Sequence, residues 1–272
     1  MLMPVLPPGL RELLAQHFPG AEVLSAVALA PDAGASETLK GQGYGAPLRV
    51  VIRLAEGGER TVVFHTATSN VFGHDRRADR AAEMLLAWDT FNGVPDHIRA
   101  LDVGAILPGG RLLSVREGGE FYLLTTFAQG RMYAEDLRAA AARGEATERD
   151  LTRAEALARW LARLHAGKVD DPDAYRRAVR DLVGHGEGIF GMVDGYGPGV
   201  PGAPPERLRR LEELALAWRW RLRGRERRLR RTHGDFHPFN IVFEEGPGTG
   251  FTLLYASRGG RGDPADDLIC LS

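Results

Sequence analysis

The stretch H-G-D-F-H-P-F-N, residues 233–240, carries side chains that suit transfer of a phosphoryl group to a hydroxyl. Asp235 can accept the proton of an attacking hydroxyl as a general base. Asn240, five residues later, can present an amide oxygen to Mg²⁺, which prefers oxygen ligands. A short loop between rigid elements would hold both groups around one phosphoryl group. We therefore take Asp235 as the candidate catalytic residue and Asn240 as the candidate metal ligand.

The segments on either side of this loop are expected to be regular structure. Residues 227–231, R-R-L-R-R, lead in from a predicted helix, and residues 241–245, I-V-F-E-E, form a predicted strand. The loop is thus anchored at both ends.

The first part of the chain has the pattern of strands. Residues 48–55 and 60–67 are rich in β-branched side chains and are joined by the turn signal E-G-G-E. Residues 111–115 and 120–127 predict two more strands. Between the two pairs, apolar residues at helical spacing predict a helix over residues 75–91.

From about Tyr133 onward the pattern is helical. A helix is predicted over residues 147–167, with its apolar stripe formed by Leu151, Leu157, Ala158, Leu161 and Leu164. A second helix is predicted over residues 205–224, and the glycine-rich residues 182–202 read as a long loop. We expect an α+β fold, with a β-rich lobe over residues 1–129 and a mostly helical lobe over residues 130–272.

Composition and charge exclude several classes of function. The chain of 272 residues has a formal net charge of −1, so no overall field attracts nucleic acid or a membrane surface. No run approaches the roughly 20 apolar residues of a membrane helix, and the proline-containing N-terminus is unlike a signal peptide. The single cysteine, Cys270, fits a reducing compartment. We expect a cytoplasmic, soluble protein without nucleic-acid or membrane partners; its oligomeric state stays open.

The loop resembles that of the aminoglycoside phosphotransferase family, the small-molecule branch of the protein-kinase-like fold. Its H-G-D-x-H-x-x-N pattern is matched in full by His233, Gly234, Asp235, His237 and Asn240. The interval from Asp to Asn is also that of the protein-kinase catalytic loop. Residues 262–268, G-D-P-A-D-D-L, and 161–167, L-A-R-L-H-A-G, are similar to two further segments of the family.

The resemblance implies a two-lobed kinase-like fold and a function. The chain would transfer the γ-phosphoryl group of ATP, with Mg²⁺, to a hydroxyl of a small molecule. Asp235 would orient or deprotonate that hydroxyl and Asn240 would ligate Mg²⁺. His233 and His237 would brace the loop, and Asp263 and Asp267 would form a turn and tie the neighbouring strand to the loop.

The nucleotide would be held by the N-terminal lobe. The glycines of the segment G-Q-G-Y-G would let backbone N–H groups approach the phosphates, with a lysine beside them: Lys40, Gly41, Gly43 and Gly45. Thr126 and Phe127 would belong to the hinge that receives adenine. The resemblance implies a lysine on the third strand of the kinase-like fold, but residues 60–67 contain none. His65, paired with Glu83, is the candidate substitute.

Two further departures bear on activity. By alignment on Leu253 and Leu254, Tyr255 stands where the family has an aspartate that chelates Mg²⁺, and a phenol is a poor ligand for that ion. Asp263 is an alternative ligand. The family also continues into helices beyond the point where this chain ends, so we expect those helices to be missing or the acceptor site to be built differently.

Two other functions stay open. The first is a catalytically inactive, kinase-like nucleotide-binding or scaffold protein, which Tyr255 and the missing strand lysine favour and the intact loop disfavours. The second is a nucleic-acid binder built on the arginine-rich helix. That function ranks last, because the chain lacks net positive charge.

Overall fold

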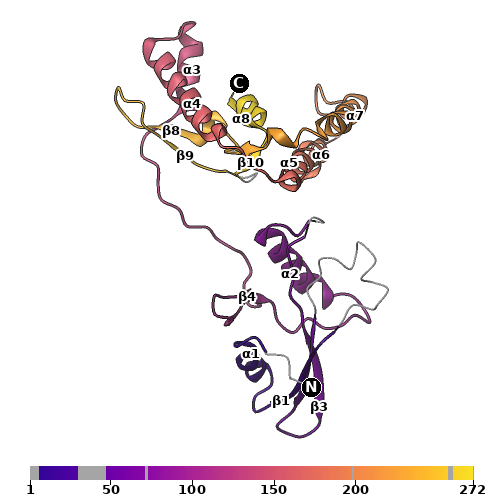
Figure 1. Cartoon of the computed structure of the whole chain (residues 1–272). Coiled ribbons are helices and arrows are strands. Elements are labelled where there is room, and N and C mark those ends of the chain that lie inside the picture. The colour runs from indigo at the N-terminus through magenta and orange to yellow at the C-terminus, as the bar shows by residue number, and fades with distance from the viewer. Residues whose placement is uncertain (1–5, 30–46, 71–72, 198, 257–259, 272) are drawn as a thin grey trace. The chain divides into compact units, whose positions relative to one another are not determined.

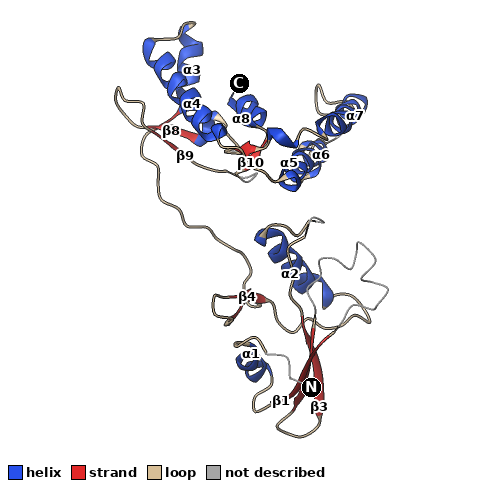
Figure 2. Cartoon of the chain, in the orientation of Figure 1, coloured by secondary structure: helices blue, strands red, loops and turns tan. Residues whose placement is uncertain are grey.

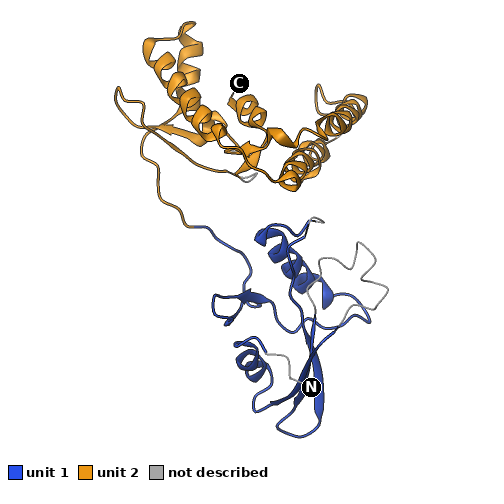
Figure 3. Ribbon diagram, viewed as in Figure 1, with its two compact units in different colours: residues 1–123 blue, residues 124–272 orange. Residues whose placement is uncertain are grey.

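The computed structural model of the chain describes residues 6–29, 47–70, 73–197, 199–256 and 260–271. The chain divides into two compact units, Met1–Leu123 and Leu124–Ser272, which are coloured separately in Figure 3. The boundary predicted after residue 129 lies in unit 2, near the end of the extended segment with which that unit begins. Each unit is described by itself.

Unit 1 is built on a three-stranded antiparallel sheet of order β1-β2-β3 (Figures 1 and 2). Its strands are β1 (Glu22–Ala28), β2 (Leu48–Arg53) and β3 (Glu59–Phe64). The predicted E-G-G-E turn joins β2 to β3, and Gly57 and Gly58 both have positive φ angles that other residues rarely adopt. Both β2 and β3 were predicted, with β3 ending three residues earlier than expected.

One face of this sheet forms a small apolar core. Val50 and Ile52 alternate along β2 and are fully buried against α1 (Leu10–His17), which contributes Leu10 and Leu14. The predicted helix is present as α2 (Arg77–Phe91), although none of its residues is buried. The unit ends with a two-stranded hairpin, β4 (Gly104–Ile106) and β5 (Leu112–Ser114).

The strand predicted over residues 120–127 is not formed. These residues are extended but unpaired, and their side chains are exposed, Phe127 by 83%. The preceding strand β5 pairs backward with β4, across the turn at Gly109 and Gly110, and not forward with this segment. An apolar run becomes a strand only where a neighbour pairs with its N–H and C=O groups, and the described residues provide none here.

Unit 2 is mainly helical (Figure 2). Its helices are α3 (Tyr133–Arg143), α4 (Glu148–Ala166), α5 (Pro172–Gly184), α6 (Ile189–Asp194), α7 (Pro205–Leu222) and α8 (Pro264–Leu271). The helices predicted over residues 147–167 and 205–224 correspond to α4 and α7. The mixture of helices and sheets agrees with the predicted α+β class. No helix in the described part of the chain is long and apolar enough to cross a membrane.

Helix α4 begins at a capping box, in which the Thr147 side chain accepts from the backbone N–H of Asp150. Its buried stripe differs in part from the predicted one. Leu157 and Leu161 are buried as expected, but Leu151 is exposed and Arg153 takes the buried position one turn before Leu157. The predicted long loop is also wrong in part, because its first residues belong to α5 and residues 189–194 form α6.

Two small sheets complete unit 2. One consists of β6 (Arg131–Met132), β8 (Ile241–Phe243) and β9 (Phe251–Leu253); the other pairs β7 (Arg230–Arg231) with β10 (Arg261–Gly262). All three residues of β8 are buried. The segment predicted to carry the chemistry therefore runs from β7 to β8, between two short strands that belong to different sheets.

Candidate active site

Residues His233–Asn240, which we call the HGD loop, close on themselves through Asp235 and Asn240. The side-chain amide nitrogen of Asn240 donates to the Asp235 carboxylate at 2.7 Å and to the Asp235 carbonyl oxygen at 3.0 Å. Residues Pro238–Asn240 form one turn of 3₁₀ helix, which brings the two side chains together. Both are partly exposed. The residues singled out for catalysis and for metal binding thus lie in direct contact.

The loop is held from behind by Asp267, on α8. This fully buried carboxylate accepts hydrogen bonds from the backbone N–H groups of His233, at 2.9 Å, and Gly234, at 2.8 Å. It also lies 2.8 Å from Nε2 of His165, at the end of α4. Gly234 has φ of +84°, a left-handed conformation that explains the glycine between the histidine and the aspartate. Three elements distant in sequence are therefore joined at one carboxylate.

An aromatic anchor that sequence analysis missed holds the middle of the loop. Phe236, next to Asp235, is fully buried and stacks on Trp160 of α4, with ring centroids 5.4 Å apart and planes 3° from parallel. It belongs to the core cluster that includes Leu157, Leu161 and residues of β8. The signal in the sequence was a phenylalanine placed directly between Asp235 and His237.

The two histidines of the loop differ in environment. The His233 ring is buried against Trp160 and Phe236, and burial lowers its pKa although the Asp267 charge opposes the shift. A pKa below the usual 6.5 keeps this ring neutral at pH 7. His237 is exposed, stacks on Phe239 and accepts a hydrogen bond at Nδ1 from the Phe239 backbone N–H. Both positions fit bracing of the loop.

A buried ion pair, also missed from the sequence, supports β8 beyond the loop. Arg153 of α4 is 1% exposed, pairs with Asp136 of α3 and donates to the Glu244 carbonyl oxygen at 3.2 Å. Its guanidinium lies 4.4 Å from the centre of the Phe243 ring. An arginine on the buried stripe of a helix was the sequence signal.

Asp263 is engaged in a cluster of its own. Arg228 donates to both of its oxygens, at 2.5 and 2.7 Å, and the Tyr175 hydroxyl donates at 3.1 Å. Burial opposes ionisation of Asp263, but these hydrogen bonds and the Arg228 charge leave its pKa lowered. Burial and the Asp263 charge raise the pKa of Tyr175 to about 12. The backbone N–H of Ala265 also bonds to Asp263, as in the predicted turn. A metal ion would have to compete with Arg228 for both oxygens of Asp263.

The donor set near Asn240 fits a divalent cation poorly. The backbone N–H of Leu254 donates to the Asn240 carbonyl oxygen at 2.9 Å, so Tyr255, the next residue, follows directly beside the HGD loop. Tyr255 is 70% exposed and brings no carboxylate. Within the described ranges there is no group of three or more His, Cys, Asp or Glu side chains that could hold a metal. Of the described side chains assigned to the site, the Asp235 carboxylate is already engaged by Asn240, which leaves Mg²⁺ few oxygen ligands there.

The residues expected to hold the nucleotide are only partly described. Lys40, Gly41, Gly43 and Gly45 lie outside the described residues. Glu83 on α2 does not pair with His65 as expected; its carboxylate lies 3.3 Å from Nε2 of His74. His65 is exposed just after β3, and among the described residues it has no hydrogen bond or ion pair. Sequence analysis did not consider His74, which lies on the segment that leads into α2 and is therefore closer in the chain to Glu83.

The two expected hinge residues lie in unit 2. Thr126 and Phe127 are exposed parts of the unpaired segment at its start. Their backbone groups form no ladder with a neighbouring strand of the described residues. Adenine binding at these positions stays a prediction.

A family model described as the phosphotransferase enzyme family, APH, matches residues 50–252, which is 203 of the 272 residues. The chain therefore belongs to the APH phosphotransferase family, as the resemblance of its loop predicted. No curated protein and no solved structure matches the chain. Membership implies a protein-kinase-like fold, while the predicted arrangement of two lobes stays a prediction.

Proposed function

We propose that this protein is an ATP-dependent phosphotransferase that transfers the γ-phosphoryl group of ATP to a hydroxyl of a small molecule. The observation that carries the proposal is the contact between Asp235 and Asn240 on a loop supported by Asp267. The family generally uses ATP and Mg²⁺ for such chemistry. The near-neutral net charge favours a small-molecule acceptor over nucleic acid, and we propose a cytoplasmic location.

In the proposed reaction, Asp235 orients the acceptor hydroxyl and takes its proton. The hydroxyl oxygen forms a bond to the γ-phosphorus, the bond from that phosphorus to the bridging oxygen breaks, and ADP leaves with the electron pair. A general base in this role accelerates a reaction by roughly 10² to 10⁴. The hydrogen bond from Asn240 and the buried Phe236 keep Asp235 in place, which preserves the alignment on which transfer depends.

A second candidate function is nucleotide binding without catalysis. It is favoured by Tyr255, which we place at the position of the family's acidic metal ligand, and by the lack of a lysine on β3. Loss of that carboxylate would weaken the metal site and leave the phosphate charge poorly neutralised. The HGD loop would then persist as part of a binding fold.

Calorimetric titration with ATP, with and without Mg²⁺, separates the two functions. The chain, its Tyr255→Asp variant and a Tyr196→Asp control at another exposed tyrosine would be compared. Mg²⁺-dependent binding by the unaltered chain, together with ADP release in the presence of an alcohol, is expected for an active phosphotransferase. The opposite result is that the unaltered chain binds ATP equally with and without Mg²⁺, or not at all, while only Tyr255→Asp binds ATP in a Mg²⁺-dependent way. That result would refute the active enzyme and support the second function.

A further inference from the structure

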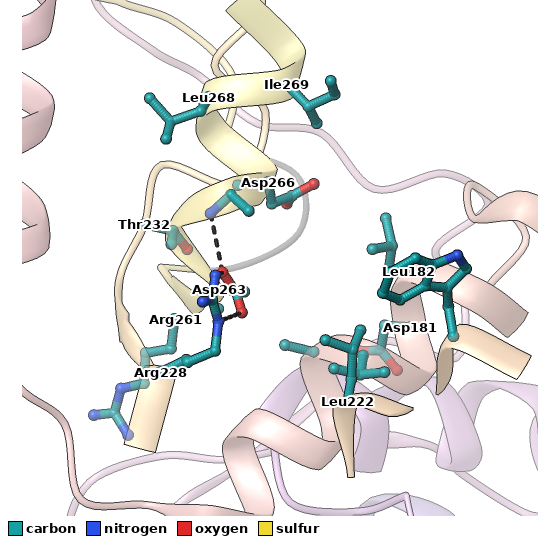
Figure 4. Close-up of a pocket in the computed structure, with 16 residues that line it drawn as sticks. Asp181, Leu182, Leu222, Arg228, Thr232, Arg261, Asp263, Asp266, Leu268 and Ile269 are labelled. Atoms are coloured by element: carbon teal, nitrogen blue, oxygen red, sulfur yellow. Dashed lines mark hydrogen bonds and ion pairs between the residues drawn. The ribbon is translucent and has the colours of Figure 1, made fainter. Parts of the chain in front are cut away.

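A pocket of about 940 Å³ lies within unit 2, beside the HGD loop (Figure 4). Its walls come from α5, α7, α8 and β10, together with Arg228 and Thr232 on either side of β7, and the loop residue Gly234 is part of its lining. Gly234 immediately precedes Asp235. The volume falls in the range of about 300–1,000 Å³ typical of small-molecule sites.

The walls of this pocket are mainly apolar. Six large side chains contribute to them: Val179, Leu182, Trp218, Leu222, Leu268 and Ile269. Three of them are more than half exposed to solvent: Trp218, Leu268 and Ile269. Figure 4 shows Leu182 and Leu222 across the pocket from Arg228 and Asp263. An apolar ligand would therefore remove considerable apolar surface from water, which favours its binding.

Four of the five charged side chains of the lining are in ion pairs, either with one another or with residues outside the lining; the fifth is Asp266. Asp181 lies 2.9 Å from Arg177 and 3.3 Å from Arg180, and Asp263 is bound by both ends of the Arg228 guanidinium. Arg261 pairs with Asp171 at 3.2 Å. A polycation such as an aminoglycoside needs several carboxylates without such partners, and paired ones offer it little attraction.

One buried polar atom in the lining lacks a partner. Thr232, on the chain just before the HGD loop, is 5% exposed, and its hydroxyl oxygen has no hydrogen-bond partner among the described residues. Leaving such a group unsatisfied is unfavourable, and the great majority of buried polar atoms in proteins are paired. Thr232 lines the pocket, but its hydroxyl oxygen has almost no exposed surface, so a bound molecule would pair with it after rotation of the side chain.

We propose that this pocket binds a small molecule with an apolar body and a hydroxyl end that hydrogen-bonds to Thr232, and not a polycation. The next step rests on the proposed function: the bound molecule is the phosphoryl acceptor, held against Gly234, the residue that precedes Asp235. The ligand class follows from the apolar walls, the neutralised carboxylates and the unsatisfied threonine.

Saturation-transfer NMR with 4-phenylbutan-1-ol as the probe, on the full chain without nucleotide, tests the ligand class. Two exposed tryptophans of α7 serve as test and control positions. Trp218 lines the pocket and Trp220 does not, while an arginine lies over the ring of each. We expect Trp218→Ala to weaken binding about tenfold and Trp220→Ala to change it less than twofold. Thr232→Val, which keeps the shape and removes the hydroxyl, should weaken binding roughly three- to tenfold.

Competition with kanamycin, a polycationic aminoglycoside, provides the opposing test. Kanamycin should leave the bound 4-phenylbutan-1-ol in place. Displacement by kanamycin at lower concentration than the alcohol itself requires, or equal losses for Trp218→Ala and Trp220→Ala, would overturn the inference. Because binding is measured without ATP, binding of the expected pattern with no phosphoryl transfer would leave the ligand class standing and refute the proposed function alone.

Discussion

The buried carboxylate of Asp267 lies 2.8 Å from Nε2 of His165, although the two residues are 102 positions apart in the chain. The same carboxylate holds the backbone of the HGD loop at His233 and Gly234. The end of α4, the start of α8 and the loop are therefore joined at one side chain. The position of Asp235 depends on a buried carboxylate outside the loop.

Removing this carboxylate should destabilise the protein strongly. Asp267→Ala leaves two buried backbone N–H groups without an acceptor, each costing about 1–3 kcal/mol, so we expect a loss of about 3 kcal/mol or more in the free energy of unfolding. Urea denaturation measures this loss. The exposed Asp170→Ala should change stability by no more than about 0.5 kcal/mol. Similar values for the two variants would contradict the supporting role of Asp267.

The buried pair of Arg153 and Asp136 should behave as a unit. Arg153→Met takes from the buried Asp136 its closer cationic partner and leaves Arg131 at 3.6 Å, so it should cost about 3–5 kcal/mol. The double variant Arg153→Met/Asp136→Leu should recover a large part of that stability, because no unpaired charge stays buried. Denaturant unfolding of the two single variants and the double variant tests the coupling, with the exposed Arg159→Met as control. Additive losses would mean that the pair contributes through packing alone.

His233 should make stability depend on pH. Because burial lowers its pKa in the folded state, the unfolded chain binds a proton more readily, and folding loses stability as the pH falls below about 6.5. Above that pH the contribution is fully present. The fall in unfolding free energy between pH 8 and pH 5.5 should be smaller for His233→Gln than for the unaltered chain. Val179→Ala, which lowers stability but keeps the histidine, should retain the original dependence; the same fall in all three proteins would count against this effect.

Asp235→Asn should separate chemistry from folding. On the proposed function, the amide cannot take the proton of the acceptor, and kcat should fall by roughly 10² to 10⁴. ATP affinity and unfolding free energy should change little, because Asp235 is partly exposed and an asparagine oxygen at this position can still accept the hydrogen bond from Asn240. ADP release measures kcat, and the exposed Asp194→Asn is the control. An unaltered kcat would show that another group takes the proton.

Much of the local structure could be predicted, because it depends on local patterns. The strands β2 and β3 and the helices α2, α4 and α7 all follow from short-range spacing and turn chemistry. The strand predicted over residues 120–127 was wrong because strand formation depends on a partner elsewhere in the chain. The neighbouring strand β5 pairs with β4 instead. Residues 189–194 are helical although their glycine-rich surroundings predict a loop.

The supports of the site were harder to foresee than the site itself. Arg153 and Phe236 have ordinary positions in the sequence, and only the fold reveals that α3, α4 and β8 enclose them. The predicted pair of His65 and Glu83 was wrong for the same reason, because Glu83 contacts His74 in the folded chain. A motif specifies the reacting groups, whereas their packing depends on contacts between distant residues.

The place of Asp267 in the sequence has a consequence for synthesis on the ribosome. The HGD loop leaves the ribosome before α8 does, and until Asp267 follows, the N–H groups of His233 and Gly234 lack their buried acceptor. A nascent chain that already contains every residue of the loop would therefore carry it unsupported. The loop can reach its final geometry only when a later segment folds back over it, so the site should mature among the last features of unit 2.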